Sequence, residues 1–184
     1  MIKKIRWLNN DLLLGLGILP TDTPRGEKRQ LERVAAHQLL TVMVGKPSAE
    51  ILHNADGAPF IDGWHISISH TRGFIAILLS IRCKVGVDIE YHSNRVQRVV
   101  SRFLRKDEPA VNVEEMLLCW CAKEAVYKLR SSLHLTHEQL RVRLDEGSVD
   151  DLMTGDTVPF GREVTPEYVL VWSWEDDDKT LDEK

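Results

Sequence analysis

The 184-residue chain has no apolar run of the roughly 20 residues that a membrane-spanning helix needs, so no membrane segment is expected. It holds only three cysteines, Cys83, Cys119 and Cys121. The C-x-C of Cys119 and Cys121 lacks the second pair that would complete a zinc site. These shortages favour a cytoplasmic protein with reduced, buried thiols.

Positive charge is not in excess either, since 24 Lys and Arg stand against 28 Asp and Glu, a formal net charge of −4. Binding of nucleic acid through overall charge is therefore not expected. The content of 43% hydrophobic and 28% charged residues is that of an ordinary globular protein. The acidic end, residues 176–184, is predicted to be a disordered tail.

The first residues, MIKKIRWLNNDLLLGLGILP, have the early lysines and the leucines of a signal peptide. Trp7 and the polar residues 9–11 interrupt the apolar stretch, however, and no small-residue cleavage site follows. We therefore expect a first strand and a loop here.

Hydrophobic spacing predicts the remaining elements. In residues 25–45 apolar side chains recur at helical spacing, and Gly45 and Pro47 are expected to end that helix. Two strands are expected in residues 64–80, around a His-Thr-Arg-Gly turn. Further elements are a strand over 83–91, helices over 95–104 and 113–130, and a closing strand over 167–175. Each half thus offers a helix and strands, which is compatible with an α+β fold, although no internal repeat is visible.

Asp88 and Glu90 stand two positions apart at the end of the strand VGVDIEY. Residues i and i+2 of a strand point to one face, so the two carboxylates project side by side. They repel each other unless a cation lies between them, and a hard ion such as Mg²⁺ or Mn²⁺ suits an all-oxygen site. A solvated strand end is the alternative interpretation.

The helix segment WCAKEAVYK places Trp120, Glu124 and Lys128 at i, i+4 and i+8, on one face, with Lys123 beside it. Glu124 and Lys128 could form a surface ion pair. Glu124 could equally supply a third carboxylate, which would leave the lysines for anionic oxygens.

A cluster of donors occurs in SISHTRG, where Ser69, His70, Thr71 and Arg72 meet at a turn. Hydroxyls, imidazole and backbone N–H groups of this kind can bind phosphate, although a Ser-His pair can also be structural. No Gly-x-Ser-x-Gly elbow is present, so a serine hydrolase is not expected.

Taken in order, GAPFI…ISISHTRG, VGVDIE and WCAKEAVYK resemble the 4′-phosphopantetheinyl transferases, specifically the two-lobed, surfactin-synthetase-activator type. EKRQLERVAAHQLL and NRVQRVVSRFLRKDE are also similar, so the resemblance covers most of residues 27–130. It implies an α+β fold of two similar α/β lobes with pseudo-two-fold symmetry, each a small antiparallel-rich sheet packed with helices. The lobes would span residues 1–84 and 85–175, with the active site in the cleft between them.

The resemblance implies transfer of the phosphopantetheine arm of coenzyme A to a serine of an apo carrier protein, which releases adenosine 3′,5′-bisphosphate. By motif match, Asp88, Glu90 and Glu124 would hold the magnesium ion. Glu124 is also the candidate base for the serine hydroxyl, and Lys128 would stabilise the transferring phosphoryl group. The residues expected to contact coenzyme A are Ser69, His70, Thr71, Lys123, Lys28 and Arg33.

Two positions depart from the family pattern: Ala58 stands where relatives usually have lysine, and His37 where they tend to have arginine. Both lost cations would lie on the side expected to grip the 3′-phosphate of coenzyme A. Lys28 and Arg33 are among the cations that could compensate. The metal-binding residues of the pattern are all present.

Arginines at Arg95, Arg98 and Arg102 form one stripe of the helix predicted over 95–104. Because carrier proteins present an acidic helix around their serine, this stripe is a candidate docking surface, and a solvated face is the alternative. The two-lobed type is expected to be a monomer. Two rival functions remain, a metal-dependent phosphodiesterase and a non-catalytic relative that binds a carrier or a nucleotide.

Overall fold

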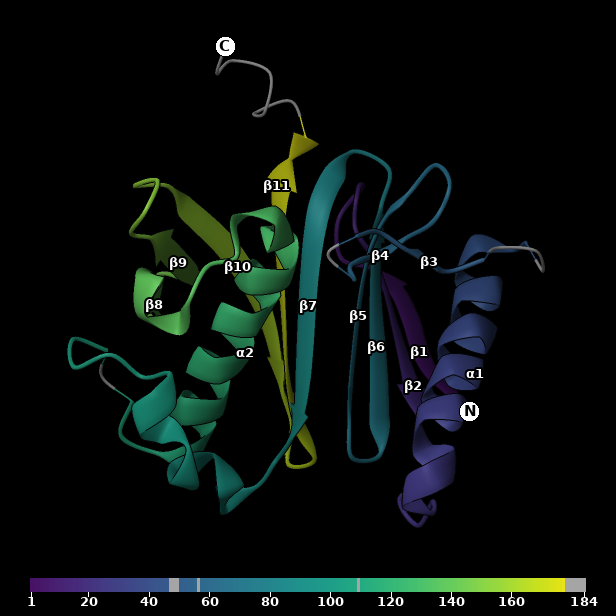
Figure 1. Ribbon diagram of the computed structural model, residues 1–184, viewed down its shortest axis with the longest axis horizontal. Helices are drawn as coiled ribbons and strands as arrows, with labels where there is room; N and C mark the ends of the chain where they lie inside the picture. The colour runs from purple at the N-terminus through teal and green to yellow at the C-terminus, as the bar shows by residue number, and fades with distance from the viewer. Residues whose placement is uncertain (47–49, 56, 109, 178–184) are drawn as a thin grey trace.

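The computed structural model describes residues 1–46, 50–55, 57–108 and 110–177. The described residues form two antiparallel sheets that lie side by side between two long helices (Figure 1). Pro47, predicted to follow the first helix, and residues 178–184 of the predicted acidic tail lie outside the described residues. Neither long helix, among these residues, is long and apolar enough to cross a membrane.

The first sheet has the strand order β1-β2-β6-β5 and is covered on its outer face by α1. A two-stranded hairpin, β3-β4, lies beside it. The elements of this layer are β1 (Ile2–Trp7), β2 (Leu13–Ile18), α1 (Arg25–Val44), β3 (Leu52–His53), β4 (Pro59–Phe60), β5 (His65–Thr71) and β6 (Phe74–Ser80).

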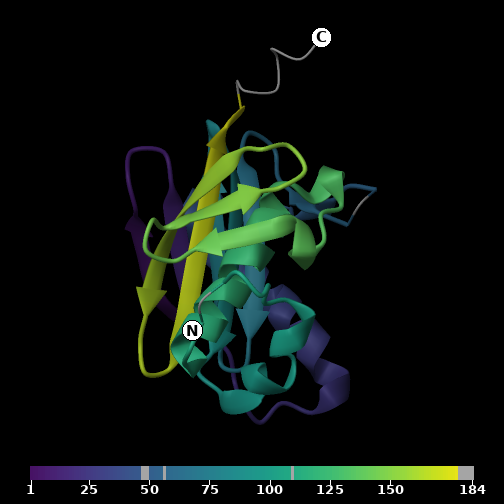
Figure 2. The same cartoon turned by 90° about the vertical axis from the view of Figure 1, so that its left-hand side faces the viewer.

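The second sheet has the order β7-β11-β10-β9-β8 and is covered by α2. Figure 2 views this layer from the α2 side, with the short 3₁₀ segments η1 and η2 at the lower end in teal. Its elements are β7 (Cys83–Tyr91), η1 (Asn94–Arg98), η2 (Val100–Arg102), α2 (Val113–Leu129), η3 (Ser131–Leu133), η4 (His137–Gln139), β8 (Leu140–Arg143), β9 (Ser148–Asp151), β10 (Thr157–Val164) and β11 (Tyr168–Asp176).

Three apolar cores hold the layers together. One lies between α1 and the first sheet, one between α2 and the second sheet, and the third fills the space between the two sheets. Strand β7 contributes Val85, Val87 and Ile89 to the central core, so the alternate residues of β7 face α2. This alternation turns Asp88 and Glu90 toward the helix.

The sequence predicted most of the regular elements. The helix expected over 25–45 is α1, and Gly45 follows it in the left-handed conformation with φ 70°, as a C-terminal glycine should. The strands over 64–80, 83–91 and 167–175 and the helix over 113–130 are also confirmed. The observed architecture is α+β with antiparallel sheets, whereas the pseudo-two-fold relation of lobes 1–84 and 85–175 stays a prediction.

Three expectations were wrong in detail. Residues 95–104 form the 3₁₀ segments η1 and η2 instead of one helix. The N-terminal segment contains two strands, β1 and β2, where one strand and a loop were expected. The short strands β8, β9 and β10 were not predicted, because β8 and β9 have only four residues each, too few for a clear alternation.

Candidate functional site

Helix α2 lies unusually close to β7 because Gly86 has no side chain. A Cβ atom at Gly86 would lie 1.9 Å from the backbone oxygen of Ala125 in the middle of α2. Asp88 and Glu90 follow Gly86 on the same face of the strand. The close approach therefore brings the helix directly over the two carboxylates.

Asp88 is buried, with 5% of its surface exposed, and its two oxygens have different surroundings. Oδ1 accepts hydrogen bonds from Ser69 Oγ at 2.7 Å and from Lys128 Nζ at 2.7 Å. Lys128 also donates to the backbone oxygen of Val87 at 3.0 Å. Oδ2 is buried and has no hydrogen-bond partner in the described part of the chain. One oxygen is thus fixed and the other is left unused.

Glu90 lies beside Asp88 and accepts a hydrogen bond from Thr71 Oγ1 at 2.8 Å. Burial raises the pKa of Glu90, and the negative charge of Asp88 raises it further. Hydrogen bonds from Thr71 and Trp120 and the charge of Lys128 lower this pKa but do not outweigh the first two effects. Burial and the charge of Asp88 thus disfavour the charged form of Glu90 in the free protein.

This environment fits a hard divalent cation. An orphaned buried carboxylate oxygen next to a second carboxylate supplies oxygen ligands, and Mg²⁺ is commonly held by one or two carboxylates together with water and phosphate oxygens. The predicted pairing of Asp88 and Glu90 on one face is present.

The third predicted ligand, Glu124, does not join the pair. Its Oε1 lies 2.9 Å from Nε2 of His137, a residue of η4 whose ring packs edge-on against Trp120. Within residues 1–46, 50–55, 57–108 and 110–177, no three His, Cys, Asp or Glu side chains form a group that could hold a metal ion. In the free protein His137 thus holds Glu124 outside the pair of Asp88 and Glu90, so two of the three predicted ligands lie together and the role of Glu124 as a metal ligand stays a prediction.

The backbone of Glu124 nevertheless faces β7. Trp120, one turn before it, hydrogen-bonds Glu90, and Lys128, one turn after it, bonds Asp88. Glu124 also lines a pocket of about 500 Å³ together with Arg102, Tyr127 and His137. About a quarter of the Glu124 side chain is exposed, at 23%, so a ligand in this pocket can reach the carboxylate.

Lys123 was expected to contact coenzyme A, but the structure places its side chain inside the protein. Its side chain is completely buried, and its ammonium group donates to Glu108 Oε2 at 2.8 Å, to the oxygen of Phe103 at 2.7 Å and to the oxygen of His137 at 3.0 Å. An ammonium group has three N–H donors, so all of them are used internally. The signal was available in the sequence, because the residues three and four positions from Lys123 in the helix are apolar or aromatic: Cys119, Trp120, Val126 and Tyr127.

Ser69 and Thr71 were expected to bind phosphate, but the structure gives their hydroxyls another role. Both residues are buried, and each donates its hydrogen to a carboxylate of β7. In the free protein these hydroxyls hold Asp88 and Glu90, and their contact with coenzyme A stays a prediction. The alternation of hydroxyls in β5 was visible in the sequence, but the strand that it faces was not.

The remaining predicted contacts for coenzyme A gather around Glu32 of α1, a residue that the sequence analysis missed. His70 Nδ1 lies 3.2 Å from Glu32 Oε1, and Lys28 Nζ lies 3.6 Å from the same atom. Arg33 and His37 are exposed on the same helix. The i, i+4 spacing of Lys28 and Glu32 was the signal that could have revealed this pair.

The predicted docking arginines Arg95, Arg98 and Arg102 are all exposed. They lie on η1 and η2, so they do not form a single stripe of an α-helix as expected. Arg102 extends this surface to the pocket that contains Glu124.

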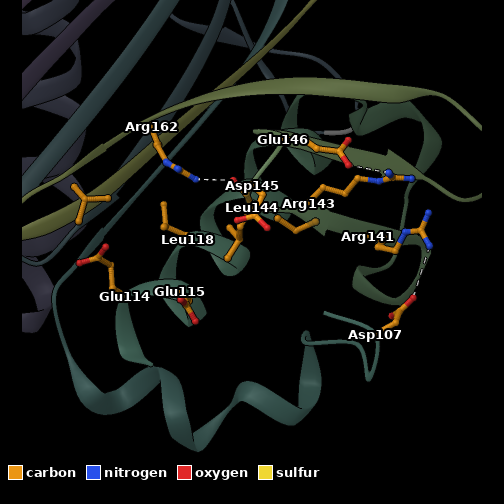
Figure 3. Close-up of a pocket in the computed structure, with 12 residues that line it drawn as sticks. Asp107, Glu114, Glu115, Leu118, Arg141, Arg143, Leu144, Asp145, Glu146 and Arg162 are labelled. Carbon is orange, nitrogen blue, oxygen red and sulfur yellow. Dashed lines mark hydrogen bonds and ion pairs between the residues drawn. The ribbon is translucent and has the colours of Figure 1, made fainter. Parts of the chain in front are cut away.

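A separate hollow of about 570 Å³ lies between the start of α2 and strands β8 and β10 (Figure 3). Arg141 and Arg143 of its lining both pair with Asp150 outside the hollow, at 2.7 and 2.8 Å, and Arg143 also pairs with Glu146 of the lining at 3.1 Å. Arg162 donates to the backbone oxygen of Leu144 at 2.9 Å. None of the predicted site residues lines this hollow.

No curated protein sequence is significantly similar to the chain. Residues 84–168 match the model of the 4′-phosphopantetheinyl transferase superfamily. The matched segment runs from β7 to the start of β11, and so the part of the chain that holds Asp88, Glu90, Glu124 and Lys128 is the part that matches this transferase superfamily.

Proposed function

We propose that the protein transfers the 4′-phosphopantetheine group of coenzyme A to a serine hydroxyl of an apo acyl or peptidyl carrier protein and releases adenosine 3′,5′-bisphosphate. The observation that carries the proposal is the carboxylate pair of Asp88 and Glu90 under α2, with Lys128 beside it, inside the segment that matches the superfamily. A pyrophosphate substrate suits this combination of oxygen ligands and a lysine.

Asp88 and Glu90 would hold a Mg²⁺ or Mn²⁺ ion. When bound, such an ion neutralises negative charge on a pyrophosphate and makes its phosphorus easier to attack. Lys128 uses two of its N–H groups, on Asp88 and on the oxygen of Val87, and keeps a third for a phosphate oxygen.

Glu124 is the proposed base. In the reaction the serine oxygen bonds to the phosphorus that carries the pantetheine arm, and the bond from that phosphorus to the leaving bisphosphate breaks. The serine proton passes to a carboxylate oxygen of Glu124, which the pocket leaves accessible. His137, at 2.9 Å, holds Glu124 in the free protein.

The nucleotide end of coenzyme A would lie near α1, where Lys28 and Arg33 supply cationic groups and His70 an imidazole. Glu32 partly neutralises this surface. Together with Ala58 and His37 in place of the usual cations, it leaves fewer positive charges for the 3′-phosphate than the family pattern provides.

The carrier protein would dock on the exposed arginines of η1 and η2, next to the Glu124 pocket. Reversal of charge in the double variant Arg98→Glu/Arg102→Glu should raise the KM for the carrier several-fold and leave the KM for coenzyme A unchanged. Steady-state kinetics at two salt concentrations would measure this. Unchanged kinetics for the carrier would remove this surface from the proposal.

We further propose that the protein acts as a monomer in the cytoplasm. Its three cysteines are free and buried, which suits a reducing compartment. Both sheets and the proposed site lie within one chain.

The test is mass spectrometry of an apo carrier protein incubated with the purified chain, coenzyme A and Mg²⁺. A gain of one phosphopantetheine mass is expected with the wild type and is absent with Asp88→Ala. Asp145→Ala, which changes an exposed aspartate of the same sheet layer, is the matched control and should retain transfer. Circular dichroism would show whether both variants fold.

Two results would contradict the transferase. Retained nucleotide without a mass gain on several apo carriers would indicate a binding protein. Cleavage of coenzyme A in the absence of any carrier would indicate a phosphodiesterase.

A further inference from the structure

Strand β7 lies at the edge of the second sheet, and β5 at the edge of the first, and the two edges face each other (Figure 1). Three hydroxyl side chains of β5 span this boundary. They accept hydrogen bonds from alternate backbone N–H groups of β7: Val87 to Ser67 Oγ at 3.0 Å, Ile89 to Ser69 Oγ at 3.3 Å and Tyr91 to Thr71 Oγ1 at 3.3 Å. We call Ser67, Ser69 and Thr71 the hydroxyl ladder.

The hydroxyl ladder fixes the register of the two sheets. Each rung joins residues that are 20 positions apart, so the strands run in the same direction with a constant offset. The side chains thus replace the backbone pairing that two adjacent strands would otherwise form. The contact depends on the spacing i, i+2, i+4, which turns all three hydroxyls to one face.

Two of the three rungs have a second partner. Ser69 donates to Asp88 Oδ1 at 2.7 Å, and Thr71 donates to Glu90 Oε2 at 2.8 Å. A hydroxyl has a single hydrogen to donate and accepts through its lone pairs. Because the backbone N–H groups of β7 occupy the acceptor side of Ser69 and Thr71, the single hydrogen of each is directed to the carboxylate.

The two carboxylate oxygens of Asp88 therefore have different hydrogen-bond partners. Oδ1 of Asp88 receives Ser69 and Lys128, whereas Oδ2 is buried without a partner in the described chain. A buried acceptor without a partner is costly and needs an explanation. A cation bound at that oxygen supplies one, since the hydroxyl would hold the carboxylate in the orientation that the cation requires.

We propose that Ser69 and Thr71 are positioning residues of the divalent-cation site, which orient Asp88 and Glu90 from the opposite sheet. The proposal rests on the proposed function, because it assumes that this carboxylate pair binds the cation. It extends that function to residues outside the matched segment, which begins at residue 84. Cation affinity then depends on the contact between the two sheets.

Ser67 is the matched control, because it forms the same contact with the backbone of β7 and contacts neither Asp88 nor Glu90 among the described residues. The experiment is isothermal titration of the metal-free protein with Mn²⁺, without coenzyme A or carrier. Ser69→Ala and Thr71→Val should each raise the Kd for Mn²⁺ about 10–100-fold. Ser67→Ala should change it less than about twofold, since Ser67 has no hydrogen bond to either carboxylate among the described residues.

Thr71→Ser keeps the hydroxyl and should restore the affinity lost in Thr71→Val. Urea unfolding of the metal-free variants gives the stability of the contact between the sheets. Ser67→Ala and Ser69→Ala each remove one rung, and Ser69→Ala should lose more stability because it also removes the hydrogen bond to the buried carboxylate of Asp88. Of the two, only Ser69→Ala should weaken Mn²⁺ binding.

Three outcomes are informative. Equal weakening of Mn²⁺ binding in Ser67→Ala and Ser69→Ala would overturn the positioning role and leave the cation site itself standing. A wild-type protein that binds no Mn²⁺ would overturn both the positioning role and the cation site. Ladder variants that behave as expected in a protein that modifies no carrier would support the positioning role and contradict the transferase.

Discussion

Lys123 and Lys128 stand five positions apart on α2, in one sequence motif, and have opposite surroundings. Burial lowers the pKa of Lys123, and its hydrogen bond and charge interaction with Glu108 raise that pKa only in part. Glu108 also accepts hydrogen bonds from the backbone N–H groups of Val142 and Arg105, at 2.6 and 2.7 Å. Lys123 thus ties the segment after η2 to α2, whereas Lys128 faces the carboxylate pair.

Lys123→Met should destabilise the protein by about 3–5 kcal/mol, because it leaves the carboxylate of Glu108 buried without a cation. Lys128→Met should cost less stability, because Lys128 is 28% exposed and water can replace part of its contact with the buried Asp88, and should abolish carrier modification. Urea unfolding and the mass-spectrometric transfer assay measure the two effects. Equal stability of the two variants would contradict the structural role of Lys123.

The position of Glu32 leads to a prediction about binding of the nucleotide end of coenzyme A. Glu32→Gln removes a negative charge next to His70 and Lys28 and should lower the KM for coenzyme A about fivefold, as expected for a contact worth about 1 kcal/mol. Glu27→Gln, on an exposed position of the same helix, is the control. An unchanged KM in Glu32→Gln would place the phosphates of coenzyme A elsewhere.

At the scale of the elements, the distance between α2 and β7 depends on Gly86. A side chain there meets backbone rather than a movable side chain, so α2 itself has to shift. That shift would separate Lys128 from Asp88 and Trp120 from Glu90.

Gly86→Ala should therefore destabilise the protein by at least about 1–3 kcal/mol and weaken Mn²⁺ binding and transfer together. Gly26→Ala is the control, because a Cβ at Gly26 meets no atom within 4 Å and alanine favours a helix. Thermal unfolding and Mn²⁺ titration are the measurements. A Gly86→Ala protein with wild-type stability would show that the two elements are less tightly packed than described.

At the scale of the whole molecule, a charged cluster joins the sheets on the side of β1. Glu163 of β10 pairs with Lys4, at 3.0 Å, and with Arg6, and it accepts a hydrogen bond from Tyr168 at 2.6 Å. Burial acts to raise the pKa of Glu163, but the hydrogen bonds of Tyr168 and Lys4 and the charge of Arg6 outweigh it, and the pKa is lowered from its usual value of 4.5.

A carboxyl group whose pKa is lower in the folded than in the unfolded state stabilises the fold at pH values above its usual pKa. This contribution is lost as the pH falls to the lowered pKa of the folded state. Glu163→Gln should therefore cost about 1–2 kcal/mol at pH 7 and progressively less below about pH 4.5. Glu167→Gln, whose partner Lys3 forms an exposed pair, should have little effect at either pH. Urea unfolding from pH 3 to pH 7 measures the difference in free energy of unfolding between the wild type and Glu163→Gln. This difference would not change with pH if the Glu163 carboxylate did not contribute to stability.

The sequence by itself determined the elements with strong local periodicity and the face that each side chain takes. The helix α1, the strands β5, β6 and β7 and the helix α2 appear nearly where the pattern predicts them. Asp88 and Glu90 share a face of β7, as predicted, and Trp120 and Lys128 lie on one face of α2, as predicted. These features depend on residues only a few positions apart, so they are legible without any knowledge of the fold.

Only the tertiary structure decided which partner each side chain meets. Buried Lys123 pairs with Glu108, and Glu124 hydrogen-bonds His137. The hydroxyls of Ser69 and Thr71 donate to carboxylates of the opposite sheet. Each of these partners is more than ten positions distant in the chain. Periodicity fixes the direction of a side chain, but the charge or donor that it meets there comes from another segment, and the packing of the two sheets and their helices brings that segment into contact.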